Sequence, residues 1–436
     1  MSEQHRSGWG RLIFRVIVVA CFLLLGAFIW FTFRGSEIEE VIRAKGEPVT
    51  LAELDAWYPS VPEERNAALL VLRAIGYVQE PPVHPPIYEW LGKKGPIPDD
   101  VKSAMSEFLT ANKKSLDLIE QASAFPESRY PISATTTFGG PMAHLSGLRK
   151  LSRLQHLDVY FRVHTEDLVG ATDSAINFMK LTETLRNEPF MLSQFTRIGC
   201  RQVVHGGIDD LIQGGPLAEK QLSALNDQLC SMENSDAMYR AMVGERCYLM
   251  NIPVSYQEGG IKGVLLSNFR GPSARLCTLA VDASRLSGVE RREQIVQLES
   301  EFSVPGSSEM RLSLNPLSLI LFPAWESVAE VFDVETAQLR VLIAVVAIER
   351  YRVANGNLPK TLDALAPSYL ESVPLDPFDD KQIRYVQSEV GYVVYSVGVN
   401  ELDEKGSQAS DNSQASDNSQ ASDNLYGNDI VLRVAR

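Results

Sequence analysis

The sequence predicts a mainly α-helical protein with a small α+β domain at its C-terminal end, and three observations lead to this fold class. Apolar residues recur every three or four positions through much of residues 34–331, which is typical of amphipathic helices. After residue 332, one long apolar helix is followed by short segments rich in Val, Ile and Tyr, which favour strands. Near the N-terminus, an uncharged stretch of 18 residues adds a transmembrane helix.

The expected transmembrane segment is residues 16–33, VIVVACFLLLGAFIWFTF. As a helix it would extend about 27 Å, close to the roughly 30 Å hydrocarbon core of a bilayer. Arg6, Arg11 and Arg15 precede it and acidic residues follow it, so the positive-inside rule places residues 1–15 in the cytoplasm. We expect a single-pass signal anchor in a bacterial inner (cytoplasmic) membrane, with the bulk of the chain extracytoplasmic, in the periplasm. A cleaved signal peptide is the less favoured alternative, because no small-residue cleavage motif follows.

Residues 34–331 predict a mainly helical extracytoplasmic region, either a bundle or a solenoid. Apolar side chains follow one helix face from Leu148 to Phe161. Another helix is expected over residues 99–122, because two Asp residues at its start favour the positive end of the helix dipole. Residues 251–331 show a less regular pattern. The sequence leaves open whether this region is one domain or two.

Residues 332–436 predict the small α+β domain. Asp333 is the expected N-cap of its long helix, and Gly356 is expected directly after the helix end. A short helix is expected in TLDALAPSYL. Three strands follow, in VPLDPFDDKQIRYVQ after a turn, in GYVVYSVGV and in DIVLRV, and this order favours an antiparallel sheet.

This C-terminal part resembles the globular domain of the major pseudopilin of type II secretion systems. The resemblance depends on four stretches that occur in the family's order: AIERYRVANGNLPKTLDAL, YLESVPLDPFDDKQIRY, GYVVYSVGVNELDEKG and NDIVLRV. It covers about residues 333–436, and the rest of the chain resembles no family that we recognise. Pseudopilins carry a processed leader and use one N-terminal helix as membrane span and filament core. Here the membrane segment is separate, so the resemblance implies a pseudopilin-like fold rather than polymerisation.

The resemblance also implies a calcium site in the Asp-rich loop before the last strand. Carried over position by position, the ligands would be Asp403 and Asp429, with Asn400 as a weaker third. Backbone carbonyls would complete a set of six to eight oxygens, the donor type that Ca²⁺ prefers.

The same loop contains the hexapeptide SQASDN three times in succession, from Ser407 to Asn424. This low-complexity composition is polar and lacks large apolar residues, so we expect an expanded repeat in a permissive loop. The alternative is that Asp411, Asp417 and Asp423 add calcium ligands. Calcium-binding repeats of that kind have nonapeptide spacing and paired glycines, which are absent here.

Composition and motifs narrow the function classes. The net charge of −14 and the lack of a basic cluster argue against a nucleic-acid partner. No G-x-S-x-G, H-E-x-x-H or G-x-x-x-x-G-K-[ST] motif occurs. His156 and His164 share a predicted helix, but a zinc site needs three or four convergent ligands, so we interpret them as ordinary polar positions. The cysteines beyond the membrane segment allow three pairings or none: Cys200, Cys230, Cys247 and Cys277.

These patterns favour a membrane-anchored extracytoplasmic scaffold or protein-interaction protein, with no catalytic residue assigned. Its expected partners are the membrane, through residues 16–33, and another envelope protein. The first alternative is an accessory component of a secretion or envelope-assembly system, which depends on the pseudopilin resemblance. The second is a hydrolase whose active site is dispersed along the sequence.

Overall fold

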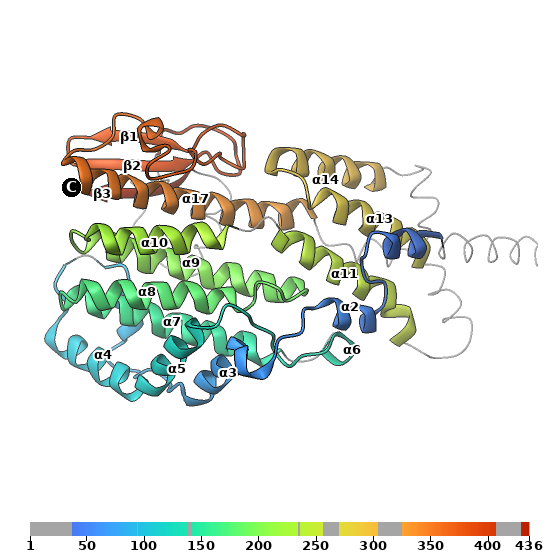
Figure 1. Ribbon diagram of the computed structural model, residues 1–436, viewed down its shortest axis with the longest axis horizontal. Coiled ribbons are helices and arrows are strands. Elements are labelled where there is room, and N and C mark those ends of the chain that lie inside the picture. Colours follow the sequence, from blue (N-terminus) through green and yellow to red (C-terminus); the bar gives the residue numbers. More distant parts are fainter. Residues whose placement is uncertain are drawn as a thin grey trace, which may run out of the picture.

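The computed structural model describes residues 37–93, 95–137, 142–233, 236–255, 270–303, 325–406 and 429–435. These residues form a mainly helical body with a three-stranded antiparallel sheet near the C-terminus, which confirms the predicted fold class at this level (Figure 1). The expected transmembrane segment and the SQASDN repeats lie outside the described ranges. Within those ranges, no helix combines the length and the apolar character needed to cross a bilayer.

The first helices along the described sequence begin and end at polar side chains. Thr50 and Glu53 form a capping box at the start of α2 (Leu51–Trp57), and the Asn66 side chain caps α3 (Ala67–Tyr77). The helix predicted over residues 99–122 is in fact two helices, which is a correction. Asn112 is fully buried between them; its Nδ2 donates to the Phe108 carbonyl and its Oδ1 accepts the Gln79 N–H at 2.8 Å. The elements are α2 (Leu51–Trp57), α3 (Ala67–Tyr77), α4 (Asp99–Ala111), α5 (Lys113–Ser123) and α6 (Ala134–Thr137).

Four longer helices follow and pack side by side: α7 (Ala143–His164), α8 (Leu168–Glu183), α9 (Met191–Gln213) and α10 (Glu219–Met232). The apolar face predicted from Leu148 is buried as expected, because Leu148, Leu151, Leu154 and Leu157 are at most 1% exposed. This face packs in a core with α3, α4 and α5. The opposite side of α7 contacts α8 and α9, so α7 is covered on most sides.

Residues 236–303, much of which the sequence pattern left irregular, also form helices where they are described. They are α11 (Asp236–Ser255), α13 (Arg270–Ala283) and α14 (Gly288–Ser303). The segment is rich in Arg and Glu, and some of these charges are buried in ion pairs. Arg246, for example, is fully buried and its Nη1 lies 2.7 Å from a Glu47 carboxylate oxygen. Charges at interior positions hide the apolar period that would predict these helices.

The long helix α17 (Trp325–Asn355) begins eight residues before the predicted N-cap. Asp333 is therefore not a cap: it lies inside the helix, is fully buried and forms ion pairs with Arg291 and Arg292 of α14. The predicted helix end is confirmed. Gly356 follows Asn355 with a φ of 75°, and its N–H bonds to the Arg352 carbonyl at 2.8 Å.

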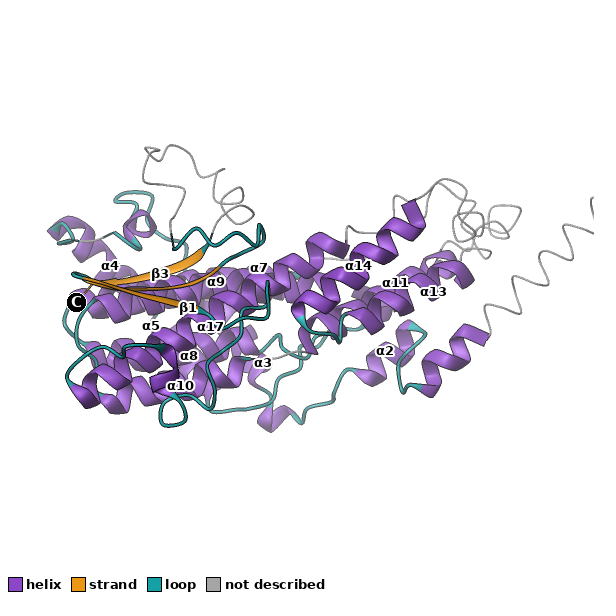
Figure 2. Cartoon of the chain, turned by 90° about the horizontal axis from the view of Figure 1, so that it is seen from above, coloured by secondary structure: helices purple, strands orange, loops and turns teal. Residues whose placement is uncertain are grey.

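The sheet has the order β1–β2–β3, with β1 (Arg384–Ser388), β2 (Gly391–Ser396) and β3 (Ile430–Ala435) all antiparallel. It lies along α17, as Figures 1 and 2 show, and Tyr392, Val394 and Val434 face the helix side. The predicted short helix before the sheet is a 3₁₀ turn, Leu362–Leu365, with both leucines buried.

One helix connects two cores of the molecule. Trp325 to Phe332, at the start of α17, pack with apolar side chains of α2, α11 and α13. Leu339 to Ile348, further along α17, pack in a single core with α7 to α10 and the sheet. The expected domain boundary at residue 332 therefore falls within a continuous helix whose two halves belong to different cores. Helices α11, α13 and α14 lie toward one end of the long axis and the sheet toward the other (Figure 2).

Candidate functional site

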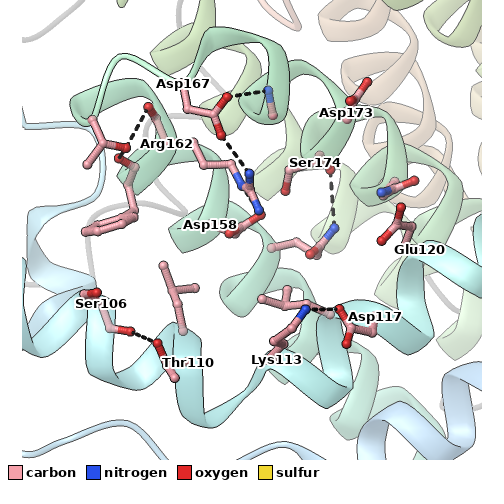
Figure 3. Close-up of a pocket in the computed structure, with 17 residues that line it drawn as sticks. Ser106, Thr110, Lys113, Asp117, Glu120, Asp158, Arg162, Asp167, Asp173 and Ser174 are labelled. Atoms are coloured by element: carbon pink, nitrogen blue, oxygen red, sulfur yellow. Dashed lines mark hydrogen bonds and ion pairs between the residues drawn. The ribbon is translucent and has the colours of Figure 1, made fainter.

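A groove of about 500 Å³ opens between α4 and α5 on one side and α7 and α8 on the other (Figure 3). Its size is within the range of ligand pockets. Acidic side chains dominate its lining, with five carboxylates against the two cations Lys113 and Arg162, a net charge of −3. The five carboxylates are Asp117, Glu120, Asp158, Asp167 and Asp173.

Both cations of the groove are engaged by carboxylates. Arg162 lies between Asp158, whose Oδ2 is 2.9 Å from its Nε, and Asp167, whose Oδ2 is 2.8 Å from its Nη1. Burial alone would lower the pKa of Arg162, but these two carboxylates outweigh it and raise the pKa above its usual value. The Lys113 Nζ lies 2.9 Å from Asp117 in the next turn of α5. The groove therefore has no spare positive charge.

Glu120 and Asp173 complete the acidic lining from opposite walls, α5 and α8. Both are exposed, and within the described part of the chain neither carboxylate has a hydrogen bond or an ion pair. Figure 3 shows both at the same end of the groove. Two unpaired carboxylates at one opening give the groove a negative potential that a cation would relieve.

The floor of the groove is polar although it is buried. Gln155 and Asp158 of α7 and Ser174 of α8 are 2%, 6% and 5% exposed. The Gln155 Nε2 donates to the Ser174 carbonyl at 3.3 Å. The Ser174 hydroxyl is buried and has no hydrogen-bond partner among the described residues. A buried hydroxyl without a partner costs free energy, and a polar ligand that reached this hydroxyl from the groove would offset that cost with a hydrogen bond.

The structure brings together two of the three residues predicted for calcium. Asp429 accepts the backbone N–H groups of Gly406 and Glu404, at 2.7 and 3.4 Å. Burial, followed by smaller contributions from the charges of Asp403 and Glu404, raises the pKa of Asp429 despite these bonds. Asp403 accepts the Tyr395 hydroxyl at 3.0 Å, and Tyr395 has its pKa raised to about 12 by burial and then by this bond.

The third residue, Asn400, lies in the same loop, where its Oδ1 accepts the Leu402 N–H at 3.0 Å, a bond typical of an Asx turn. The donor chemistry of the two aspartates fits a hard cation such as Ca²⁺, and their charges would be stabilised by it. Among the described residues, no group of three or more His, Cys, Asp or Glu side chains is placed to hold a metal ion. Asp403 and Asp429 would thus need carbonyl or water oxygens to complete a site.

A Ser, a Glu and a His also meet in the interior, between α7 and the start of α9. His144 Nε2 and Ser193 Oγ both bond to Glu188 Oε1, at 3.0 and 2.5 Å. In a hydrolase, the histidine would have to accept a proton from the serine, whereas here both contact the carboxylate. All three side chains are at most 6% exposed, and Tyr130 stacks on the histidine ring. The geometry is that of a structural interaction.

The other residues singled out in the sequence also have structural partners. His156 Nε2 lies 2.9 Å from Asp210 Oδ2, an ion pair between α7 and α9 if the histidine is protonated, and the ring of His164 packs on Tyr160. Cys200, Cys230, Cys247 and Cys277 are all free thiols. Burial raises the pKa of Cys247 and of Cys277 to about 12, so neither is a reactive thiolate.

Comparison with protein-family models, with curated proteins and with solved structures found no match to this chain. The acidic groove was not found from the sequence, because its carboxylates are spread over residues 117–173 and three helices. A partial signal existed: residues 158–173 contain four acidic residues, and three of them, Asp158, Asp167 and Asp173, line the groove.

Proposed function

We propose that this protein is a membrane-anchored extracytoplasmic scaffold that binds another envelope protein. The observation that carries the proposal is the acidic groove between α4–α5 and α7–α8, which is open to solvent and lined mainly by helical residues. A binding surface on packed helices is pre-organised, which lowers the entropy cost of association. The anchor, residues 16–33, is the sequence-based part of the proposal.

Buried ion pairs support the idea of a stable platform. Glu183, Arg197 and Arg201 form a network between α8 and α9, and Arg201 reaches Glu335 of α17. Arg291 and Arg292 join α14 to Asp333 of α17 in the same way. Such networks favour one arrangement of the helices, because a shifted packing would leave charges buried without partners.

The test is photocrosslinking in cells. A photoreactive amino acid would replace Thr110, an exposed residue on the rim of the groove, in the full chain. We expect one discrete crosslinked product containing a second envelope protein. The same amino acid at Glu371, an exposed position in the C-terminal region, is the matched control and should not give that product. If the rim position gives no product, and neither do Ser106 and Thr165, the scaffold proposal is wrong.

The second candidate function is an accessory role in a secretion or envelope-assembly system. The observation that favours it is the order of elements at the C-terminus, where α17 leads to an antiparallel β1–β2–β3 sheet packed on that helix. This is the order that the pseudopilin resemblance implies. Identification of the crosslinked protein separates the two candidates, since a secretion-system component is expected only for the second.

We further propose that Asp403 and Asp429 bind Ca²⁺ in the loop that closes this domain. The proximity of the two carboxylates, whose negative charges oppose each other, supports it. A bound cation would stabilise the loop between β2 and β3 without taking part in partner binding, because the acidic groove is built from other helices.

A further inference from the structure

We infer that the acidic groove binds an organic cation, an alkylammonium or guanidinium group. The cation would be the charged end of a Lys or Arg side chain of the partner, or of a free polyamine. This inference rests on the proposed function, because it names the chemistry by which the same groove recognises its partner.

The charge distribution of the groove favours a cation. Lys113 and Arg162 are already neutralised by Asp117, Asp158 and Asp167. The carboxylates of Glu120 and Asp173 are left without an ion pair in the described part of the chain, one on each wall. Lys113 acts electrostatically on Glu120 as well, but its ammonium group is paired with Asp117, and the lining keeps a net charge of −3 that attracts a cation.

The floor of the groove is polar and independently favours a polar ligand. Ser174 is 95% buried, lines the groove and keeps its hydroxyl without a partner, next to the buried amide of Gln155. A hydroxyl oxygen accepts a hydrogen bond from an ammonium or guanidinium N–H. Charged rims on protein surfaces are usually solvated, but a buried polar floor beneath such a rim indicates a site for a polar ligand.

The walls supply the third requirement, a place for the ligand's methylene groups. Leu109, Leu116 and Phe161 line the groove together with the carboxylates. Lysine, arginine and polyamines combine an apolar stem with a charged end, and such groups bury the stem while the charge stays hydrated or paired. A volume of about 500 Å³ holds one or two such chains but no folded domain.

The experiment is calorimetric titration of the full chain in detergent at low salt, with two probes in separate arms. One probe is spermidine. The other is a peptide of alternating Gly and Lys whose two termini are blocked and therefore uncharged. The test variant is Glu120→Gln/Asp173→Asn, and the control is Glu371→Gln/Glu389→Gln, which removes two exposed carboxylates outside the groove. Both variants have the same net charge, so general attraction of cations affects them equally.

We expect the test variant to weaken binding at least about tenfold and the control less than about twofold, since two charges next to the ligand are each worth a large part of 1.4 kcal/mol. Ser174→Ala should weaken binding a few-fold with all charges kept. Binding of the peptide identifies a partner's side chain as the source of the cation, and binding of spermidine alone identifies a free polyamine. No binding by the wild type, or equal loss in both double variants, would overturn the inference.

The photocrosslinking experiment keeps the two proposals separate. If the rim crosslinks to a partner but neither probe binds, the scaffold remains and the cation inference is wrong. If a probe binds but no rim position crosslinks, the groove is a cation site and the scaffold proposal is wrong.

Discussion

Replacing Glu183 by Gln tests the buried ion network that joins α8 and α9 to α17. The Glu183 carboxylate, only 14% exposed, pairs with the guanidinium groups of Arg197 at 3.0 Å and Arg201 at 2.6 Å. Both arginines are almost fully buried. Burial alone would raise the pKa of Glu183, but the two arginines outweigh it and lower the pKa to about 2, from 4.5.

The magnitude follows from that pKa. Lowering a carboxyl pKa from 4.5 to about 2 corresponds to about 3 kcal/mol in favour of the charged form in the folded state. Breaking a buried ion pair by removing one partner costs a similar 3–5 kcal/mol, roughly, because the remaining charge stays buried. We therefore expect Glu183→Gln to lower the free energy of unfolding by about 3 kcal/mol at pH 7, since Arg197 loses its carboxylate.

The pH dependence gives the result a signature. A group whose pKa is lower in the folded state stabilises the protein above its unfolded pKa, and the stabilisation is lost as pH falls toward the folded pKa. The contribution of Glu183 is therefore complete above about pH 4.5 to 5 and decreases toward pH 2. At pH 3 the difference between wild type and Glu183→Gln should shrink to about 1 kcal/mol.

The assay is urea unfolding of the full chain in detergent, followed by circular dichroism at pH 7 and pH 3. The matched control is Glu219→Gln, which removes a carboxylate that pairs with Arg350 of α17 at 2.8 Å but is 47% exposed. It should cost less than about 1 kcal/mol, as exposed ion pairs do. A loss for Glu183→Gln as small as for the control, or a loss that is equal at both pH values, would refute the role given to the network.

Three further predictions concern packing, protonation and metal. Gly244→Ala should destabilise the protein by about 2 kcal/mol or more, because an added Cβ would lie 1.6 Å from the Pro189 carbonyl oxygen. Gly199 has open space around it, so Gly199→Ala should stabilise the protein by about 0.5–1 kcal/mol. Thermal unfolding measures both changes, and equal shifts for the two variants would contradict this packing. Burial lowers the pKa of His205 to about 4, so the free energy of unfolding should fall as pH drops from about 6.5 toward 4, by about 2 kcal/mol at pH 5. His205→Gln should remove this decline in urea titrations. An unchanged decline would show that another group is responsible. If the Asp403–Asp429 site has a Kd near about 10 μM, 1 mM Ca²⁺ should stabilise the full chain by about 2.7 kcal/mol relative to a chelator. The stabilisation should be the same with and without Ser407–Asn424, and Asp429→Asn should abolish it. No stabilisation of the wild type by Ca²⁺ would contradict the calcium proposal.

Local sequence patterns predicted the parts of the fold that depend on neighbours along the chain. The apolar face that starts at Leu148 is buried as expected, and Gly356 ends α17, because periodicity and helix termination are decided within a few residues. The antiparallel sheet was predictable for the same reason, since its three strands are short and follow turn residues.

The features that the sequence did not predict depend on contacts between segments far apart along the chain. Asp333 has the composition of a cap, yet it is a buried partner of Arg291 and Arg292, which lie about 40 residues earlier in a segment whose helices the pattern did not predict. The sequence did not predict the groove for a related reason. Glu120 and Asp173 line the same groove only when α5 packs beside α8. Asp403 and Asp429 were proposed together from a family resemblance, and no local pattern relates them.

The position of α17 has a consequence for the order in which the chain can fold during its synthesis. Helices α7 to α10 share their core with Leu339–Ile348, so their apolar faces stay partly uncovered until α17 has emerged. About 120 residues separate the end of α10 from the end of α17. At ribosomal rates of roughly 5–20 residues per second, this interval is roughly 6 to 25 s, far longer than helix formation or collapse takes. During this interval the apolar residues of α7 to α10 that pack against Leu339–Ile348 in the folded protein have no such partner on the chain made so far.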